Sequence, residues 1–246
     1  VVSFFRKYYP PGNASLVVAG DINTADARRL VEKWFGEIKR GKFVEPLARP
    51  AAYLASVARQ TLYDRVQLPR LYLAWLTPPQ FAPGDAALDV VANVLAGGKN
   101  SRLYKRLVYD LQIAQDVSAF QASSALSSQF LIMVTARPGH TVEEIQKIVD
   151  EELERLRQTP PEAREVERAQ NQFDASFYDG MERVGGFSGK ANQLNAYLTA
   201  TGNPDFFAED LARYRSLLPS DIQAAARAFL AADRRVELTI LPQPKK

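Results

Sequence analysis

The order of the expected elements indicates an α+β fold in which helices cover a mainly antiparallel sheet. Short apolar runs that read as strands come in pairs before residue 137, and the chain after residue 141 is mostly helical until a last strand near its end. Strands and helices that mix without regular strand–helix–strand alternation favour antiparallel pairing. A hydrophobic share of 46% in 246 residues is enough for one large or two small domains.

The first part of the chain predicts one strand and one helix. Residues 14–20 (ASLVVAG) form a nearly continuous apolar run, which is typical of a buried strand. Residues 24–38 predict a helix with a single apolar face. That face carries Ala27, Leu30, Val31, Trp34, Phe35 and Ile38. Residues 42–56 contain two prolines and little periodicity, so we expect a linker between a unit at 1–41 and a domain at 57–246.

Four strands and two helices are expected between the linker and residue 137. The strands cover residues 59–67, 70–76, 114–123 and 129–136. Asp85 is the expected cap of the first helix, which Gly97-Gly98 stops. The second helix starts at Asn100 or Ser101, and its inward positions are Leu103, Leu107 and Leu111.

The remaining chain predicts a helical run and a closing strand. Thr141 and Glu144 form a capping box that starts an amphipathic helix ending at Gln158. On this helix Glu143, Glu144, Glu151 and Glu152 are expected to face water. The chain from Thr159 to Leu230 is mostly helical, with breaks expected at Gly185-Gly186, at Gly202-Asn203-Pro204 and at Pro219. Residues 235–241 (RVELTIL) predict the last strand.

Composition excludes several kinds of chemistry. The chain has no cysteine, which excludes disulfides and thiolate sites, and its only histidine is His140. A zinc site built on imidazoles needs two or three of them, so we predict no metal site and no catalytic residue in this chain. We expect His140 to be a solvent-facing turn residue. A net charge of +3 with interspersed signs argues against nucleic-acid binding, and no run is long and apolar enough for a membrane span.

Ordered landmarks along the whole chain resemble one protein family. Residues 5–21 resemble the segment that closes the first domain of pitrilysin/insulinase-type zinc metallopeptidases, the inverzincins. Residues 95–104 (LAGGKNSRLY) resemble the signature of their second domain. Residues 130–139, 219–222 and 236–242 match later landmarks in the same order. The resemblance implies the α+β fold of the processing peptidases, in which two homologous domains close around an unfolded peptide.

The resemblance also implies where the zinc is held. Family members carry His-x-x-Glu-His in the first domain, and this chain has no such motif. We therefore expect zinc in a preceding domain of the parent protein and no cofactor in this chain. Because the chain starts without Met and within a structural unit, we interpret it as a processed or truncated fragment.

A second departure from the family lies after Ser101-Arg102-Leu103. Active members and complementary partner subunits carry an Arg and a Tyr seven residues apart, which help to bind substrate and to stabilise the oxyanion. An ungapped alignment places Val108 and Gln115 at these positions. Arg106 and Tyr109 lie nearby, but they are three residues apart and not seven, so we do not take them as a replacement for the pair. Substrate-binding residues therefore stay unassigned.

These observations predict the C-terminal, non-zinc-binding part of a bacterial-type zinc metallopeptidase, forming half of a peptide-binding chamber and a subunit interface. The alternatives are a structural non-peptidase member of the same superfamily and a stand-alone peptide-binding module. Expected partners are the preceding catalytic domain, a homologous subunit or a second copy, and an unfolded peptide. The exposed apolar face at residues 14–38 should be covered by the second domain or a neighbouring chain. The resemblance suggests a periplasmic location, which the sequence leaves open.

Overall fold

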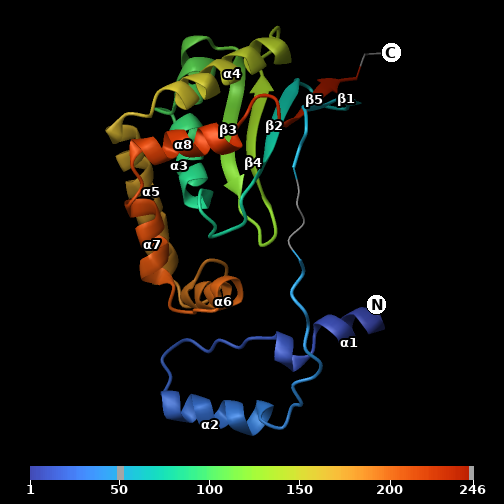
Figure 1. Cartoon of the computed structure of the whole chain (residues 1–246), viewed down its shortest axis with the longest axis vertical. Helices are drawn as coiled ribbons and strands as arrows, with labels where there is room; N and C mark the ends of the chain where they lie inside the picture. Colours follow the sequence, from blue (N-terminus) through green and yellow to red (C-terminus); the bar gives the residue numbers. More distant parts are fainter. Residues whose placement is uncertain (49–52, 244–246) are drawn as a thin grey trace. The chain divides into compact units, whose positions relative to one another are not determined.

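The computed structural model describes residues 1–48 and 53–243 and is shown in Figure 1. The chain divides into two compact units. One unit contains residues 1–48 and 174–210, and the other contains residues 49–173 and 211–246. The predicted division into 1–41, 42–56 and 57–246 stays a prediction, and four residues of the predicted linker, 49–52, lie outside the described residues.

The larger unit is built on a five-stranded sheet with the order β1-β5-β2-β4-β3 (Figure 1). The strands are β1 (Ala58–Asp64), β2 (Arg70–Thr77), β3 (Ala114–Ala122), β4 (Ser128–Ala136) and β5 (Val236–Pro242). Only the β1–β5 pairing is parallel, and the three other pairings are antiparallel. The predicted α+β fold with a mainly antiparallel sheet is therefore confirmed.

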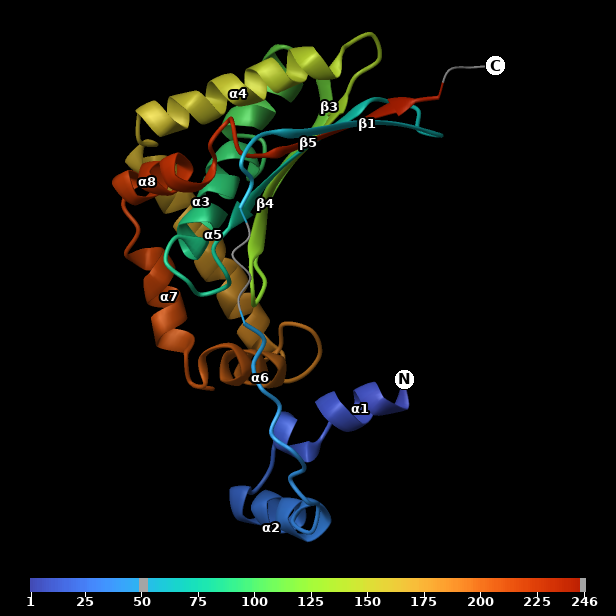
Figure 2. The ribbon, with the colours of Figure 1, turned by 45° about the vertical axis from the view of Figure 1, so that its right-hand side comes forward.

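Helices α3 (Asp85–Ala96), α4 (Val142–Gln158) and α8 (Pro219–Phe229) cover one face of this sheet (Figure 2). Alternation along β2 places Leu71, Leu73 and Trp75 on that face, where each is at most 1% exposed. Strand β4 contributes Phe130 and Ile132 to the same core. Because successive strand side chains point to opposite sides, one apolar alternation is enough to build this helix-covered face.

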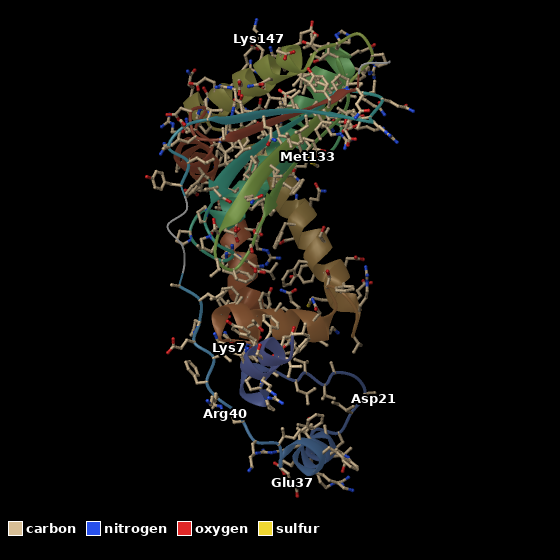
Figure 3. The ribbon with its side chains drawn as sticks, turned by 90° about the vertical axis from the view of Figure 1, so that its right-hand side faces the viewer. Lys7, Asp21, Glu37, Arg40, Met133 and Lys147 are labelled. Atoms are coloured by element: carbon tan, nitrogen blue, oxygen red, sulfur yellow. The ribbon has the colours of Figure 1, made fainter. Side chains whose placement is uncertain are left out.

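The other face of the sheet carries none of these three helices. Tyr72 of β2 is paired with Met133 of β4, which is paired with Ser118 of β3, so the three residues form one row. Figure 3 shows Met133 on the side of the sheet away from α4. Phe120, in the adjacent row, is 39% exposed. We call this surface the helix-free face.

The chain from Thr159 to Leu230 is mostly helical, as predicted. Its helices are α5 (Ala163–Glu182), α6 (Lys190–Thr201), α7 (Phe207–Arg215) and α8. The break at Gly185-Gly186 separates α5 from α6, and α6 ends at Gly202, whose φ of +78° suits a residue without a side chain. Within the described residues, none of the helices combines the length and apolarity that a membrane crossing needs.

The helix predicted after Ser101 changes its winding, which corrects one predicted core position. Residues 104–110 form a π-helix, η2 (Tyr104–Asp110), and the Leu111 N–H donates to the Arg106 carbonyl, five residues back. Leu103 and Leu107 are fully buried as predicted, but Leu111 is 46% exposed. The wider turn rotates the end of the segment away from the core, which a period of 3.6 residues cannot anticipate.

The N-terminal segment contains α1 (Val2–Tyr8), the short helix η1 (Pro11–Asn13) and α2 (Thr24–Phe35). No strand forms at residues 14–20, because this segment pairs with no other strand of the described chain. The helix predicted at 24–38 is present and capped by Asn23, but none of its residues is buried. Trp34, for example, is 67% exposed. The described chain thus leaves the predicted apolar face uncovered.

Candidate functional site

The Gly-Gly turn that joins α3 to the π-helix has a structural role. A side chain at Gly97 would meet the Asn93 carbonyl oxygen at 2.5 Å, and Gly98 has a φ of +93°. Ser101 is fully buried, and its hydroxyl donates a hydrogen bond of 2.6 Å to the Gly98 carbonyl. These contacts fix where η2 begins and therefore where its side chains point.

The two positions aligned with the Arg/Tyr pair lie in different surroundings. Val108 is partly buried and packs against the core, so its side chain supplies neither charge nor a hydrogen bond. Gln115 is exposed at a bulge at the start of β3. Arg106 is paired with two carboxylates, whereas Tyr109 is 73% exposed. This difference supports leaving Arg106 and Tyr109 out as a replacement pair.

Gln115 lines a cavity of about 400 Å³ at one end of the helix-free face. Arg70 Nε donates to Thr135 Oγ1 at 3.1 Å, and Thr135 Oγ1 donates to Asp116 Oδ1 at 3.1 Å. Arg70 Nη1 also lies 3.3 Å from the Tyr72 hydroxyl, and this hydrogen bond raises the pKa of Arg70. The cavity can therefore offer both donors and acceptors to a polar ligand. The cavity could not be predicted from the sequence, because its lining residues come from four strands and from the loop before β2.

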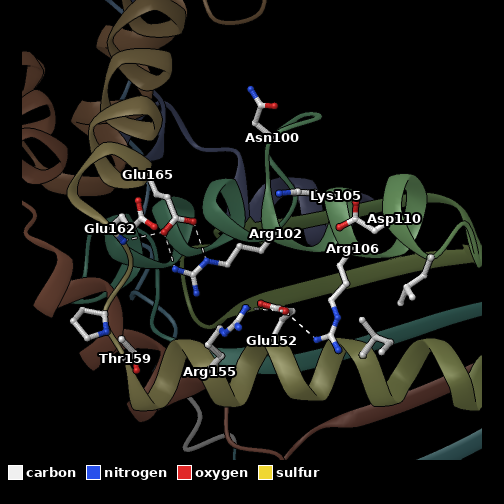
Figure 4. Close-up of a pocket in the computed structure, with 13 residues that line it drawn as sticks. Asn100, Arg102, Lys105, Arg106, Asp110, Glu152, Arg155, Thr159, Glu162 and Glu165 are labelled. Carbon is white, nitrogen blue, oxygen red and sulfur yellow. Dashed lines mark hydrogen bonds and ion pairs between the residues drawn. The ribbon is translucent and has the colours of Figure 1, made fainter.

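A larger, charged groove of about 830 Å³ lies among the helices (Figure 4). One wall comes from residues 100–111, the floor from α4, and one end from residues 159–165. Its charged lining residues are Arg102, Lys105, Arg106, Asp110, Glu152, Arg155, Glu162 and Glu165. The apolar residues Leu111, Ile148 and Pro160 and the polar residues Asn100 and Thr159 complete the lining. Positive and negative groups are equally numerous, so the groove suits a ligand that presents more than one kind of polar group.

Arg102 and Glu165 tie the groove wall to α5. Arg102 Nε and Nη2 donate to the two oxygens of Glu165 at 2.9 and 2.7 Å, and both side chains are less than one-fifth exposed. Burial alone would raise the pKa of Glu165. The hydrogen bonds from Arg102 and from the Glu162 N–H oppose it, and the pKa of Glu165 lies below its ordinary value of 4.5. The pair is therefore charged near neutral pH.

The variant Glu165→Gln is expected to lose about 1.5–3 kcal/mol of stability at pH 7, because one partner of a charged, two-bond pair becomes neutral. The folded pKa of Glu165 is depressed, so its contribution is complete above the ordinary value of 4.5 and is lost as the pH falls through the folded pKa. Urea unfolding from pH 7 to pH 3 should show the two proteins converging in acid. A stability difference that is the same at both pH values would contradict this account.

Glu152 corrects a second sequence-based expectation. It was expected on the water-facing side of α4, as Glu151 is, but it is only 3% exposed. Its Oε1 accepts from Arg106 Nη1 at 3.0 Å and lies 3.5 Å from Arg155 Nη1. The helical period places residue 152 at the edge of the apolar face, where the π-helix brings Arg106 over it.

His140 lies in the turn before α4, and its side chain is 36% exposed. Its Nδ1 is 3.4 Å from Glu144 Oε2, and Glu144 and Thr141 form the predicted capping box. In the part of the chain that the structure describes, no three His, Cys, Asp or Glu side chains come together to hold a metal. The residues of this chain do not fit the zinc site that the resemblance implies, and the placement of zinc in a preceding domain stays a prediction.

Comparisons with known proteins show what the chain is similar to. The profile of the peptidase M16 inactive domain matches residues 1–173. The chain is 26% identical over 188 residues to the zinc protease PqqE of Helicobacter pylori, which covers 74% of this chain and 42% of PqqE. The chain thus spans less than half the length of that curated relative.

Solved structures show the same architecture. A protease from Helicobacter pylori has a TM-score of 0.82 at 21% identity, over 98% of this chain and 58% of that chain. The periplasmic protease PqqL from Escherichia coli has a TM-score of 0.69 at 17% identity, over 91% of this chain and 25% of that chain. At these identities the likeness shows the fold, and it agrees with the predicted α+β architecture.

Proposed function

Because the chain belongs to the peptidase M16 inactive-domain family, we propose that it forms the non-catalytic half of a peptide-binding chamber in a zinc metallopeptidase. The preceding catalytic domain of the parent protein supplies the zinc and the groups that activate water. This chain supplies a surface along which an unfolded peptide lies. The family resemblance suggested by residues 5–21 and 95–104 is thereby confirmed, while the chamber remains our proposal.

The helix-free face is the observation that carries this proposal. It presents apolar side chains in its middle, such as Phe120 and Met133, and a polar cavity with Arg70 and Asp116 at one end. A broad face of this kind can hold side chains of varied chemistry without demanding one sequence. Val108 and Gln115 supply no Arg/Tyr pair, so we assign that role to a homologous partner subunit or domain.

The uncovered face of α2 supports a contact with the catalytic domain. Leu16, Ile22, Leu30 and Trp34 are each more than 40% exposed, and together they border an apolar hollow of about 340 Å³. Exposed apolar surface of this kind marks an interaction site. We propose that the preceding domain or a homologous subunit covers it. PqqL, whose fold this chain shares, is a periplasmic protease, which supports a periplasmic location for the parent protein of this chain.

The chamber proposal is tested by photo-cross-linking at the helix-free face. The photo-reactive residue p-benzoylphenylalanine replaces Phe120 or Met133. Each variant is mixed with its zinc-bearing counterpart, which is the polypeptide that carries the preceding catalytic domain, and with a chelator. Reduced, carboxymethylated α-lactalbumin is added as an unfolded probe. Both positions should cross-link to the probe, because both lie on the face assigned to the peptide.

Lys147 provides the matched control position. It is exposed on α4, on the opposite side of the sheet from Met133 (Figure 3). Cross-linking at position 147 should stay at the background level. Equal yields at the three positions, or a yield confined to position 147, would exclude the helix-free face as the peptide surface. A purely structural member of the family would give no cross-link to the probe at any of them.

A further inference from the structure

The charged groove contains a buried carboxylate oxygen without a hydrogen-bond partner. Glu152 is 3% exposed, and its Oε2 has no hydrogen bond although Oε1 is engaged by Arg106. In Figure 4 the carboxylate lies between Arg155 and Arg106 and faces the groove that Arg102 borders. A buried charged acceptor left without a donor is costly, so the site favours a ligand that brings an N–H or O–H group to it.

The charges around Glu152 decide what kind of donor fits. Arg106 and Arg155 both contact Glu152 Oε1, and the Glu152 charge contributes to the raised pKa of Arg102. Because Arg106 and Arg155 already contact this carboxylate, a further cation would gain little attraction there. The favoured donor is therefore uncharged, such as the backbone N–H of a peptide.

The groove also offers cationic groups that can bind an anion. Among the described residues, Lys105 has no ion pair, and it lines the wall above Glu152 (Figure 4). Arg155 is 70% exposed and meets Glu152 only at 3.5 Å. A compact dianion such as sulfate is disfavoured, because it has no donor for Glu152 Oε2 and would face that carboxylate. A single carboxylate with a neighbouring N–H meets both requirements.

The π-helix is what places these groups together. Lys105, Arg106, Asp110 and Leu111 all line the groove, because the wider turn of η2 directs a broader part of its surface toward α4. π-Helical turns are rare and are found frequently at functional sites. Leu111, turned out of the core, and Ile148 add an apolar patch beside the charged groups.

We propose that this groove binds the C-terminal residue of a peptide through its free carboxylate. The terminal carboxylate accepts hydrogen bonds from Lys105 and Arg155, and the N–H of the terminal residue donates to Glu152 Oε2. An apolar terminal side chain packs on Leu111 and Ile148. The groove lies on the helix-covered side of the sheet, so it is an anchoring site separate from the proposed chamber and does not depend on it.

The test compares two peptides that differ in one group. Fluorescein-labelled Gly-Ala-Gly-Ala-Leu with a free C-terminal carboxylate is titrated with the intact chain by fluorescence anisotropy, in parallel with the same peptide as its C-terminal amide. The carboxylate peptide should bind at least about tenfold more tightly than the amide, because only its charged terminal group can form charge-assisted hydrogen bonds with Lys105 and Arg155. Lys105→Met and Glu152→Gln should each weaken its binding by about tenfold or more.

Lys147→Met removes the same charge from the same region outside the groove and should leave both affinities unchanged. Lys105 is exposed, so its variant folds even if Glu152→Gln is destabilised. Equal affinities for the two peptides, absence of saturable binding, or an equal loss in Lys105→Met and Lys147→Met would each overturn the proposal. Cross-linking at positions 120 and 133 is a separate measurement, so failure here leaves the chamber proposal standing.

Discussion

Replacement of Asp85 by Ala is expected to lower the free energy of unfolding by about 3–5 kcal/mol, because it removes one partner of a buried ion pair. Asp85 is 2% exposed at the start of α3. Its Oδ2 accepts from Arg213 Nη2 at 2.9 Å and from the Phe81 N–H at 2.9 Å. Its Oδ1 accepts from Ser123 Oγ at 2.6 Å and from Gln121 Nε2 at 3.2 Å. One carboxylate thus holds together α3, the end of β3 and α7.

Urea unfolding at pH 7 measures this effect. Asp85→Asn keeps the shape of the side chain and one oxygen that can accept at most two hydrogen bonds, but it loses the ion pair with Arg213. It should therefore lower the free energy of unfolding by less than Asp85→Ala does. Asp233→Ala is the matched surface control, because the Asp233 side chain is 83% exposed, and it should change stability by no more than about 0.5 kcal/mol. A loss for Asp85→Ala as small as that of the control would show that the buried cluster does not stabilise the fold.

The local pattern predicted most of the regular elements because their signals are local. The capping box of Thr141 and Glu144 is formed as expected, and the strand expected at residues 70–76 is present as β2 (Arg70–Thr77). Asp85 shows where local reasoning ends. It was expected to cap α3, whereas Gly84 is the N-cap and the Asp85 carboxylate serves residues up to 128 positions away in sequence.

The groove could be predicted only in part. Arg102 was noted as part of a family signature, but its partner Glu165 lies 63 residues further along. Glu152 was expected to face water, since a charged side chain in a helical repeat normally does. Its burial and the exposure of Leu111 both follow from the π-helix, which adds one residue to a turn without a clear sequence signal. The strand expected at residues 14–20 shows a related limit, because a strand requires a partner strand and none of the residues that the structure describes provides one.

The absence of catalysis by the chain alone is the second large expected effect. A single histidine, paired with Glu144 at a helix start, gives zinc too few ligands, so neither tight zinc binding nor a metal-activated water is available from these residues. A polypeptide that carries His-x-x-Glu-His supplies both. Peptide cleavage should therefore be several orders of magnitude faster in the presence of that polypeptide than with this chain alone, in keeping with the size of enzymatic rate enhancements.

The most direct measurement is zinc content together with peptide cleavage, made on the same samples. The chain is equilibrated with zinc, freed of loosely bound metal and assayed with reduced, carboxymethylated α-lactalbumin, alone and mixed with its zinc-bearing counterpart. We expect far less than one zinc per chain and no cleavage from the chain alone, with chelator-sensitive cleavage in the mixture. One tightly bound zinc per chain, or chelator-sensitive cleavage without the counterpart, would contradict the assignment of this chain as the non-catalytic half.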